Sequence, residues 1–102
     1  MTSSSEKTAT FLRACRHAVE LGNKIARSAQ ETDSWAVADG ILAGAIQYWL
    51  YVRSPCDDLR CESCQPLRSS AGRLRELQDL VRVMATESEY FHRSTDLDVG
   101  HA

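Results

Sequence analysis

The chain contains 102 residues, of which 43% are hydrophobic and 25% charged, a composition typical of one globular domain. This length excludes an enzyme built from two domains with an active-site cleft between them. The 12 basic and 14 acidic residues give a formal net charge of -2 at pH 7, so the sequence predicts no general electrostatic attraction for nucleic acid or anionic lipid.

The N-terminal part of the chain predicts a flexible segment followed by a long amphipathic helix. Residues 1–6 are rich in serine and are expected to be flexible. The first residues also lack the basic and apolar regions of a signal peptide, so we expect a cytoplasmic protein with reduced cysteines. A helix with one buried stripe is predicted over residues 7–29. Its hydrophobic side chains recur at steps of three and four: Phe11, Leu12, Cys15, Ala18, Val19, Gly22, Ile25, Ala26 and Ala29.

A second helix is predicted over residues 34–53, after a short connection in which Asp33 or Ser34 can cap its first turn. A connection this short is typical of an antiparallel helical hairpin. Between Trp35 and Val52 the sequence has one charged residue, Asp39. The same segment contains a row of small residues that permits close approach of another helix: Ala36, Gly40 and Gly44.

A helix this apolar must be covered by its own bundle, by another subunit or by lipid. The run is short for a membrane span and Asp39 is costly in hydrocarbon, so the sequence favours a bundle helix and no membrane partner. Because one small chain offers few groups to surround this helix, we expect a homo-oligomer, specifically a homodimer with the helix in a two-fold interface. Three aromatic residues near its end are suited to anchor that contact: Tyr48, Trp49 and Tyr51.

A cysteine-containing loop is predicted over residues 54–67, because Pro55 disfavours helical geometry in the residue before it. Its cysteines follow the spacing Cys-x4-Cys-x2-Cys and are Cys56, Cys61 and Cys64. A Cys-x2-Cys pair can bind one zinc ion through two thiolates, and a third cysteine can reach the same ion where the loop folds back. Zinc requires a fourth ligand, for which the candidates are Cys15 and His92.

Other chemistry fits the same three cysteines, and the sequence leaves it open. They can remain free thiols, or two of them can form a local disulfide. Their spacing equals that of the first three cysteines of a plant-type [2Fe–2S] ferredoxin, although no downstream fourth cysteine follows. Cys61 and Cys64 also precede a predicted helix, whose dipole would lower the pKa of a thiol, so thiol-redox chemistry is a further alternative.

A third helix is predicted over residues 68–91, and residues 92–102 are expected to form a tail. The hydrophobic seam of this helix alternates steps of three and four through Leu74, Leu77, Val81, Met84, Ser88 and Phe91. The sequence therefore predicts an all-α fold. We expect a small antiparallel three-helix bundle, formed by a single helical domain of residues 1–102, with the cysteine-containing loop between helices 2 and 3.

The sequence favours a non-enzymatic function without excluding catalysis. It lacks the phosphate-binding, dinucleotide-binding, metalloprotease and nucleophile-elbow motifs, so no catalytic or cofactor-binding residue is assigned. Basic residues do not cluster with aromatic residues, which argues against nucleic-acid binding. We expect a binding or assembly module with an unidentified protein partner, in which the loop holds structural zinc or a local disulfide. The alternative is a small thiol-redox or metal-binding protein that uses Cys56, Cys61 and Cys64.

Overall fold

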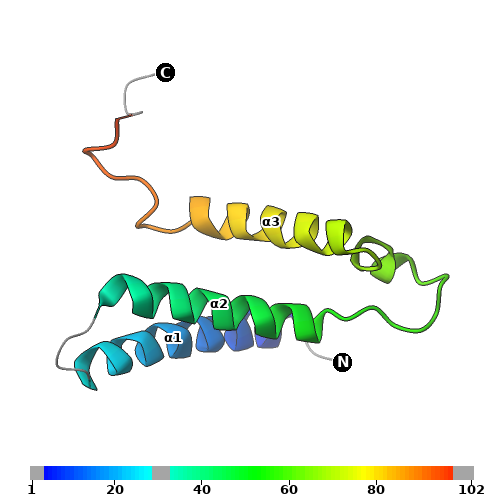
Figure 1. Cartoon of the computed structure of the whole chain (residues 1–102), viewed down its shortest axis with the longest axis horizontal. Coiled ribbons are helices and arrows are strands. Elements are labelled where there is room, and N and C mark those ends of the chain that lie inside the picture. The colour runs from blue at the N-terminus through cyan, green and yellow to red at the C-terminus, as the bar shows by residue number, and fades with distance from the viewer. Residues whose placement is uncertain (1–3, 29–32, 98–102) are drawn as a thin grey trace. The chain divides into compact units, whose positions relative to one another are not determined.

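Helices dominate the computed structural model, which describes residues 4–28 and 33–97. In chain order they are α1 (Ser4–Ser28), α2 (Ser34–Val52), the short 3-10 helix η1 (Glu62–Leu67) and α3 (Ser70–Thr86) (Figure 1). The described residues contain no β-strand, and the cysteine-containing loop lies between α2 and α3. The predicted all-α class is confirmed. The chain divides into two compact units, Met1–Val52 and Arg53–Ala102, and each is described by itself.

The first unit is a helical hairpin. Helix α1 begins at Ser4, so the prediction that residues 4–6 are flexible is wrong; residues 1–3 lie outside the described part of the chain. The Thr8 hydroxyl donates a hydrogen bond to the Ser4 carbonyl at 2.9 Å within this first turn. Helix α2 ends one residue earlier than predicted, and its start is capped as predicted. The Asp33 carboxylate accepts hydrogen bonds from the backbone N–H groups of Trp35 and Ala36, at 3.0 and 3.3 Å.

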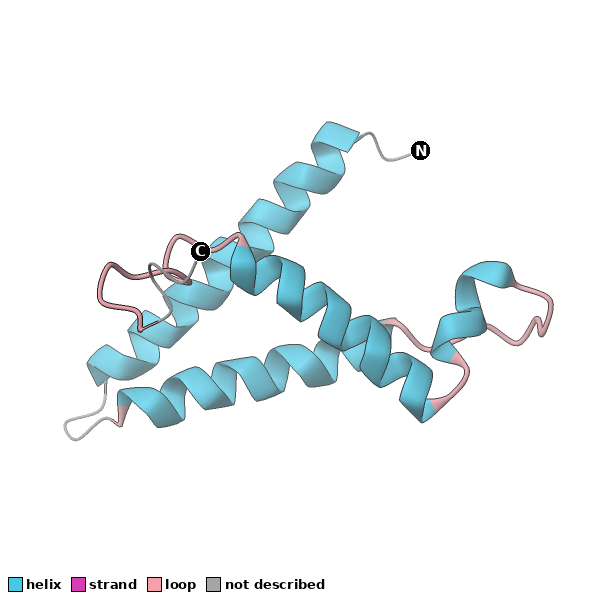
Figure 2. Ribbon diagram, turned by 90° about the horizontal axis from the view of Figure 1, so that it is seen from above, coloured by secondary structure: helices cyan, strands magenta, loops and turns pink. Residues whose placement is uncertain are grey.

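Within this hairpin, α1 and α2 approach closely near their connection and then diverge (Figure 2). At the close approach, a Cβ added to Gly22 would lie 3.8 Å from Ile41 Cγ1, an ordinary van der Waals distance. Farther from the connection the helices do not cover each other, and no residue of α1 or α2 is buried in the described chain. The predicted burial of the α1 stripe is therefore wrong for the single chain, because Leu12 and Val19 remain 58% and 60% exposed.

The second unit joins η1 to α3 through a tight corner. Leu67, at the end of η1, is the one buried hydrophobic residue among those described. The Ser69 hydroxyl caps α3 by accepting a hydrogen bond from the Gly72 N–H at 2.9 Å. A Cβ added to Gly72 would lie 2.1 Å from the Pro66 carbonyl oxygen, so this corner requires glycine. Helix α3 consequently begins at Ser70, two residues later than predicted.

Helix α3 ends at Thr86, five residues before the predicted end at Phe91. The Thr86 hydroxyl donates to the carbonyls of Arg82 and Val83, at 2.9 and 3.1 Å. Beyond it the Ser88 hydroxyl accepts from the Tyr90 N–H at 3.2 Å, and the chain continues in turns. Side chains that bond to the nearby backbone compete with helix formation, which explains the early end.

The predicted three-helix bundle and the predicted C-terminal tail are described only in part by the structure. Packing of α3 against the hairpin to form a three-helix bundle in one domain stays a prediction. In the tail, the Asp96 carboxylate accepts from the Arg93 N–H at 2.9 Å, and residues 98–102 lie outside the described chain. None of the helices in the described residues has both the length and the hydropathy to span a membrane.

Candidate metal centre

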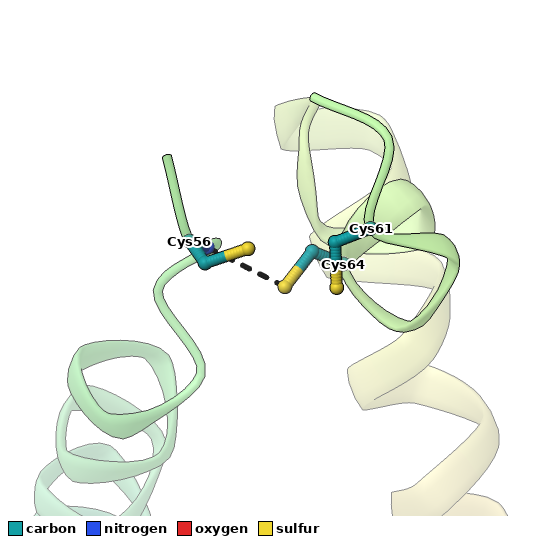
Figure 3. Close-up of side chains that lie close together, drawn as sticks. All are labelled: Cys56, Cys61 and Cys64. Atoms are coloured by element: carbon teal, nitrogen blue, oxygen red, sulfur yellow. Dashed lines mark hydrogen bonds between the residues drawn. The ribbon is translucent and has the colours of Figure 1, made fainter. Parts of the chain in front are cut away.

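The three cysteines of the loop come from two short segments of the second unit. Cys56 follows Pro55 directly, whereas Cys61 lies at the N-cap of η1 and Cys64 lies within it. The Cys61 N–H donates to the Asp58 carbonyl at 3.1 Å, and the Cys64 N–H donates to the Cys61 carbonyl at 3.3 Å. These two backbone hydrogen bonds bend the chain back toward Cys56. The loop therefore places Cys56 opposite the Cys-x2-Cys pair (Figure 3).

The side chains of the three cysteines converge. Their Sγ atoms all lie within 4.8 Å of one another, and the Cys56 N–H donates a hydrogen bond to Cys64 Sγ at 3.4 Å (Figure 3). In a tetrahedral zinc site with bonds of about 2.3 Å, two thiolate sulfurs lie about 3.8 Å apart. The three sulfurs are thus separated by at most about 1 Å more than in a zinc-bound arrangement. It forms one continuous group of soft ligands.

All four cysteines are free thiols. A disulfide requires a bond of about 2.05 Å between two sulfurs, and none of the cysteines is bonded in this way. The predicted local disulfide is therefore not present in the structure. The alternatives that remain for the loop are a metal site and a set of free thiols.

Hydrogen bonds to backbone carbonyls hold the loop in this conformation. Arg68 Nη1 donates to the Cys56 carbonyl at 3.0 Å, and Arg68 Nη2 donates to the Asp58 carbonyl. The Gln65 side-chain amide donates to the Leu59 carbonyl at 2.7 Å. Each of these contacts ties residues 56–59 to η1 or to the residue directly after it. The separation between Cys56 and the other two cysteines is thus set by side chains as well as by the backbone.

The same contacts shift the pKa values of Cys56 and Cys64 in opposite directions. The pKa of Cys56 is lowered, first by a backbone hydrogen bond at Asp58 and then by hydrogen bonds with the Cys64, Cys61 and Arg68 side chains. The pKa of Cys64 is raised. The Cys56 N–H acts to lower it, but hydrogen bonds with the Cys56 and Cys61 thiols, desolvation and the charge on Cys56 act together in the other direction. Cys56 is therefore the first of this pair to become a thiolate as pH rises.

The structure assembles the three predicted loop ligands but not the predicted fourth. Cys15 is exposed on α1, in the first unit, and its role as a ligand stays a prediction. His92 follows the end of α3 and packs edge to face with Phe91, with ring centroids 4.8 Å apart. Among the described residues the group of possible metal ligands consists of the three loop cysteines. Sequence reasoning missed Arg68, whose side chain reaches back 12 residues to Cys56.

Comparison of the chain with known protein families, with curated proteins and with solved structures finds no match.

Proposed function

We propose that the protein is a non-enzymatic assembly module whose cysteine-containing loop binds a structural zinc ion. The observation that supports this is the convergence of three free thiols, Cys56, Cys61 and Cys64, within 4.8 Å of one another. Thiolate sulfur is a preferred ligand of zinc, and an approach of at most about 1 Å between the sulfurs would bring them to the spacing found around a bound ion. The fourth ligand in this proposal is Cys15, His92 or a group supplied by another molecule.

A structural role fits the weak packing around the thiols. Leu67 is the one described hydrophobic side chain that is buried, so hydrophobic burial supplies little of the stability that a unit of this size needs. An ion bound by Cys56, Cys61 and Cys64 would cross-link the start of the second unit to η1, immediately before α3. The free energy of metal binding would then contribute to folding of the unit.

The zinc proposal is tested by native mass spectrometry and circular dichroism of the full chain, with and without chelator. We expect one zinc ion per chain, lost on chelation together with part of the helical signal. Cys64→Ser should abolish binding. The matched variant Cys15→Ser reports whether Cys15 is the fourth ligand, since it leaves the loop intact. A chain that takes up no zinc during titration, and whose helicity chelator does not change, would refute the proposal.

We further propose that the module self-associates through α2. The observation behind this is the exposure of large aromatic side chains on that helix: Trp35, Tyr48 and Tyr51 are 82%, 70% and 78% exposed. Complete burial removes about 150–250 Å² per aromatic side chain, so Tyr48 and Tyr51, which lie one turn apart on α2, could together bury on the order of 300 Å². That is more than a third of the roughly 800 Å² that each partner contributes to a stable interface.

A second copy of the chain is the partner that fits this surface. Helix α2 has one charged residue, Asp39, so its surface offers a partner little opportunity for charge complementarity. A two-fold contact places the same apolar residues of both copies against each other and requires no opposite charges. The interface would also cover the space left where α1 and α2 diverge. Self-association thus supplies the burial that neither helix obtains within its own chain.

Sedimentation velocity of a matched pair of variants tests the self-association. Tyr48 in α2 and Tyr90 after α3 are both 70% exposed, so replacing either by glutamate adds the same charge at an equally exposed position. We expect Tyr48→Glu to yield a monomer and Tyr90→Glu to remain a dimer, because burying an unpaired carboxylate is costly. A monomeric native protein, or equal behaviour of the two variants, would contradict the assignment of α2.

Thiol–disulfide chemistry at the same cysteines is the alternative function. It is favoured by the fact that Cys56, Cys61 and Cys64 are free and close together. A redox protein should cycle between dithiol and disulfide without unfolding, whereas a structural zinc protein should lose its metal and helicity when its thiols are oxidised. Circular dichroism before and after stoichiometric oxidation separates the two functions.

A further inference from the structure

We propose that Arg68 is the positioning residue of the zinc site, holding Cys56 opposite Cys61 and Cys64 and offsetting the negative charge of the bound thiolates. This inference rests on the proposed zinc function and adds to it a residue that is not a ligand. It is carried by three contacts of one guanidinium group with the segment that contains Cys56.

Arg68 fixes the position of Cys56 through hydrogen bonds to the backbone. The two Nη atoms of Arg68 donate to different carbonyl groups, those of Cys56 and Asp58, and so hold both ends of one short segment. A planar guanidinium can make two such bonds at once, which an ammonium group cannot do with the same geometry. Arg68 itself lies directly after η1, which carries Cys61 and Cys64. The side chain therefore connects the two segments that supply the ligands.

Arg68 also brings a positive charge close to the sulfur of Cys56. Arg68 Nη2 also lies 3.9 Å from Cys56 Sγ, and none of the described carboxylates forms an ion pair with this guanidinium. Three thiolates around a divalent zinc ion leave a net charge of -1. The neighbouring Asp57, Asp58 and Glu62 add further negative charge to the loop. The positive charge of Arg68 thus lies beside the Cys56 sulfur, where it can offset the negative charge of a metal-bound thiolate.

The remaining guanidinium nitrogen of Arg68 is Nε. Arg68 Nε is buried and has no hydrogen-bond partner among the described residues. An unpaired buried donor is unfavourable, so the orientation of this side chain must be maintained by its other contacts. Those contacts are the two carbonyl bonds and the approach to Cys56. The contacts with the loop therefore maintain the orientation of the guanidinium, although its Nε donor remains unsatisfied.

The test measures zinc affinity by chelator competition in the full chain. Arg68→Met should weaken zinc binding about 10- to 100-fold, the usual effect of removing a group that orients metal ligands. The matched control is Arg60→Met, which removes the same charge from the same loop and should change the affinity less than about threefold. Arg68→Lys keeps the charge but not the paired carbonyl bonds, and should stay closer to Arg68→Met than to the native protein.

Cobalt substitution gives a readout that a merely structural role would not move. Thiolate-to-cobalt absorption reports how many cysteines bind the ion, and in Arg68→Met it should fall as Cys56 leaves the site, by about one third with three thiolate ligands and by about one quarter with Cys15 as a fourth. Full recovery of affinity in Arg68→Lys would overturn the positioning role, as would an unchanged affinity in Arg68→Met.

A metal-free measurement distinguishes failure of this inference from failure of the zinc proposal. The Cys56 amide donates a hydrogen bond to Cys64 Sγ. Loss of the Arg68 contacts should therefore accelerate hydrogen exchange at this amide roughly tenfold. If the native chain binds no zinc but the exchange effect is present, the zinc proposal fails and the positioning role of Arg68 stands. If zinc binds and neither affinity nor exchange responds to Arg68→Met, the inference about Arg68 fails alone.

Discussion

Replacement of Gly44 by alanine should have opposite effects on an isolated α2 and on an α2 packed against a second copy. A Cβ added at Gly44 meets no atom within 4 Å in the described part of the chain, beyond its immediate neighbours and the backbone of its own helix. In the isolated chain the substitution therefore replaces a poor helix former by the best one without steric cost. The expected gain is about 0.8–1.0 kcal/mol, equivalent to a rise of about 4–8 °C in Tm for a chain of this size.

In a dimer whose helices approach through the row Ala36, Gly40 and Gly44, the same methyl group must fit between two backbones. Overpacking of this kind costs about 1–3 kcal/mol, which raises the dissociation constant roughly 5- to 150-fold. Sedimentation velocity over a dilution series measures the dissociation constant, and thermal unfolding at the lowest concentration measures the stability of the monomer. We expect Gly44→Ala to stabilise the monomer while weakening the dimer.

The control for this experiment is Gly22→Ala on α1. The added Cβ would lie 3.8 Å from Ile41 Cγ1, so it fits without displacement and should stabilise the chain by a similar amount. It should leave the dissociation constant unchanged, because Gly22 faces α2 of its own chain. If Gly44→Ala dimerises as tightly as the native protein or more tightly, the small-residue row is not at the interface, and the reasoning from close approach is refuted.

Three further predictions concern the second unit. Iodoacetamide at neutral pH should modify Cys56 before Cys64, because the pKa of Cys56 lies below its ordinary value, chiefly through the backbone hydrogen bond at Asp58, whereas that of Cys64 lies above. Peptide mass spectrometry should show this order, and urea should abolish it; an order that survives unfolding would contradict the structural cause. Ser69→Ala should destabilise α3 by about 1 kcal/mol through loss of its N-cap, and an unchanged urea midpoint would count against the cap. Gly72→Ala should destabilise the second unit by about 1–3 kcal/mol, despite the better helix propensity of alanine, since the new Cβ would lie 2.1 Å from a backbone oxygen. The urea midpoint should therefore fall, and a raised midpoint would show that the corner can open.

The ligand set of the candidate site was predictable from sequence because the signal is local. Cys61 and Cys64 are separated by one turn of backbone, and Cys56 is close enough along the chain for a loop to bring it back. The role of Arg68 was not predictable, since its side chain acts on carbonyl groups, which have no sequence signature. An arginine in a charged loop has the same pattern whether its side chain is solvated or holds the backbone.

Of the helix boundaries, too, some were predictable from the sequence and others were not. The start of α2 was predicted because Asp33 is a recognisable cap, and the structure confirms the bonds it accepts. The end of α3 was not predicted, because the hydrophobic spacing continues through Ser88 and Phe91 after the helix has stopped at Thr86. Hydrophobic period reports which side chains could share a face. It does not report where a hydroxyl group competes for the backbone.

The hydrophobic pattern of α2 indicates that this helix needs more cover than its partner in the hairpin, α1, provides. An amphipathic helix needs one covered face, but an apolar helix needs cover on most sides. Helix α1 approaches α2 near the connection, where Gly22 lies close to Ile41, and Tyr48 toward the other end of α2 remains 70% exposed. Exposed aromatic area on this scale is unfavourable in water, by about 25 cal/mol for each Å² of apolar surface. We therefore propose a covered state for α2, and the paired substitutions Tyr48→Glu and Tyr90→Glu test whether a second copy provides it.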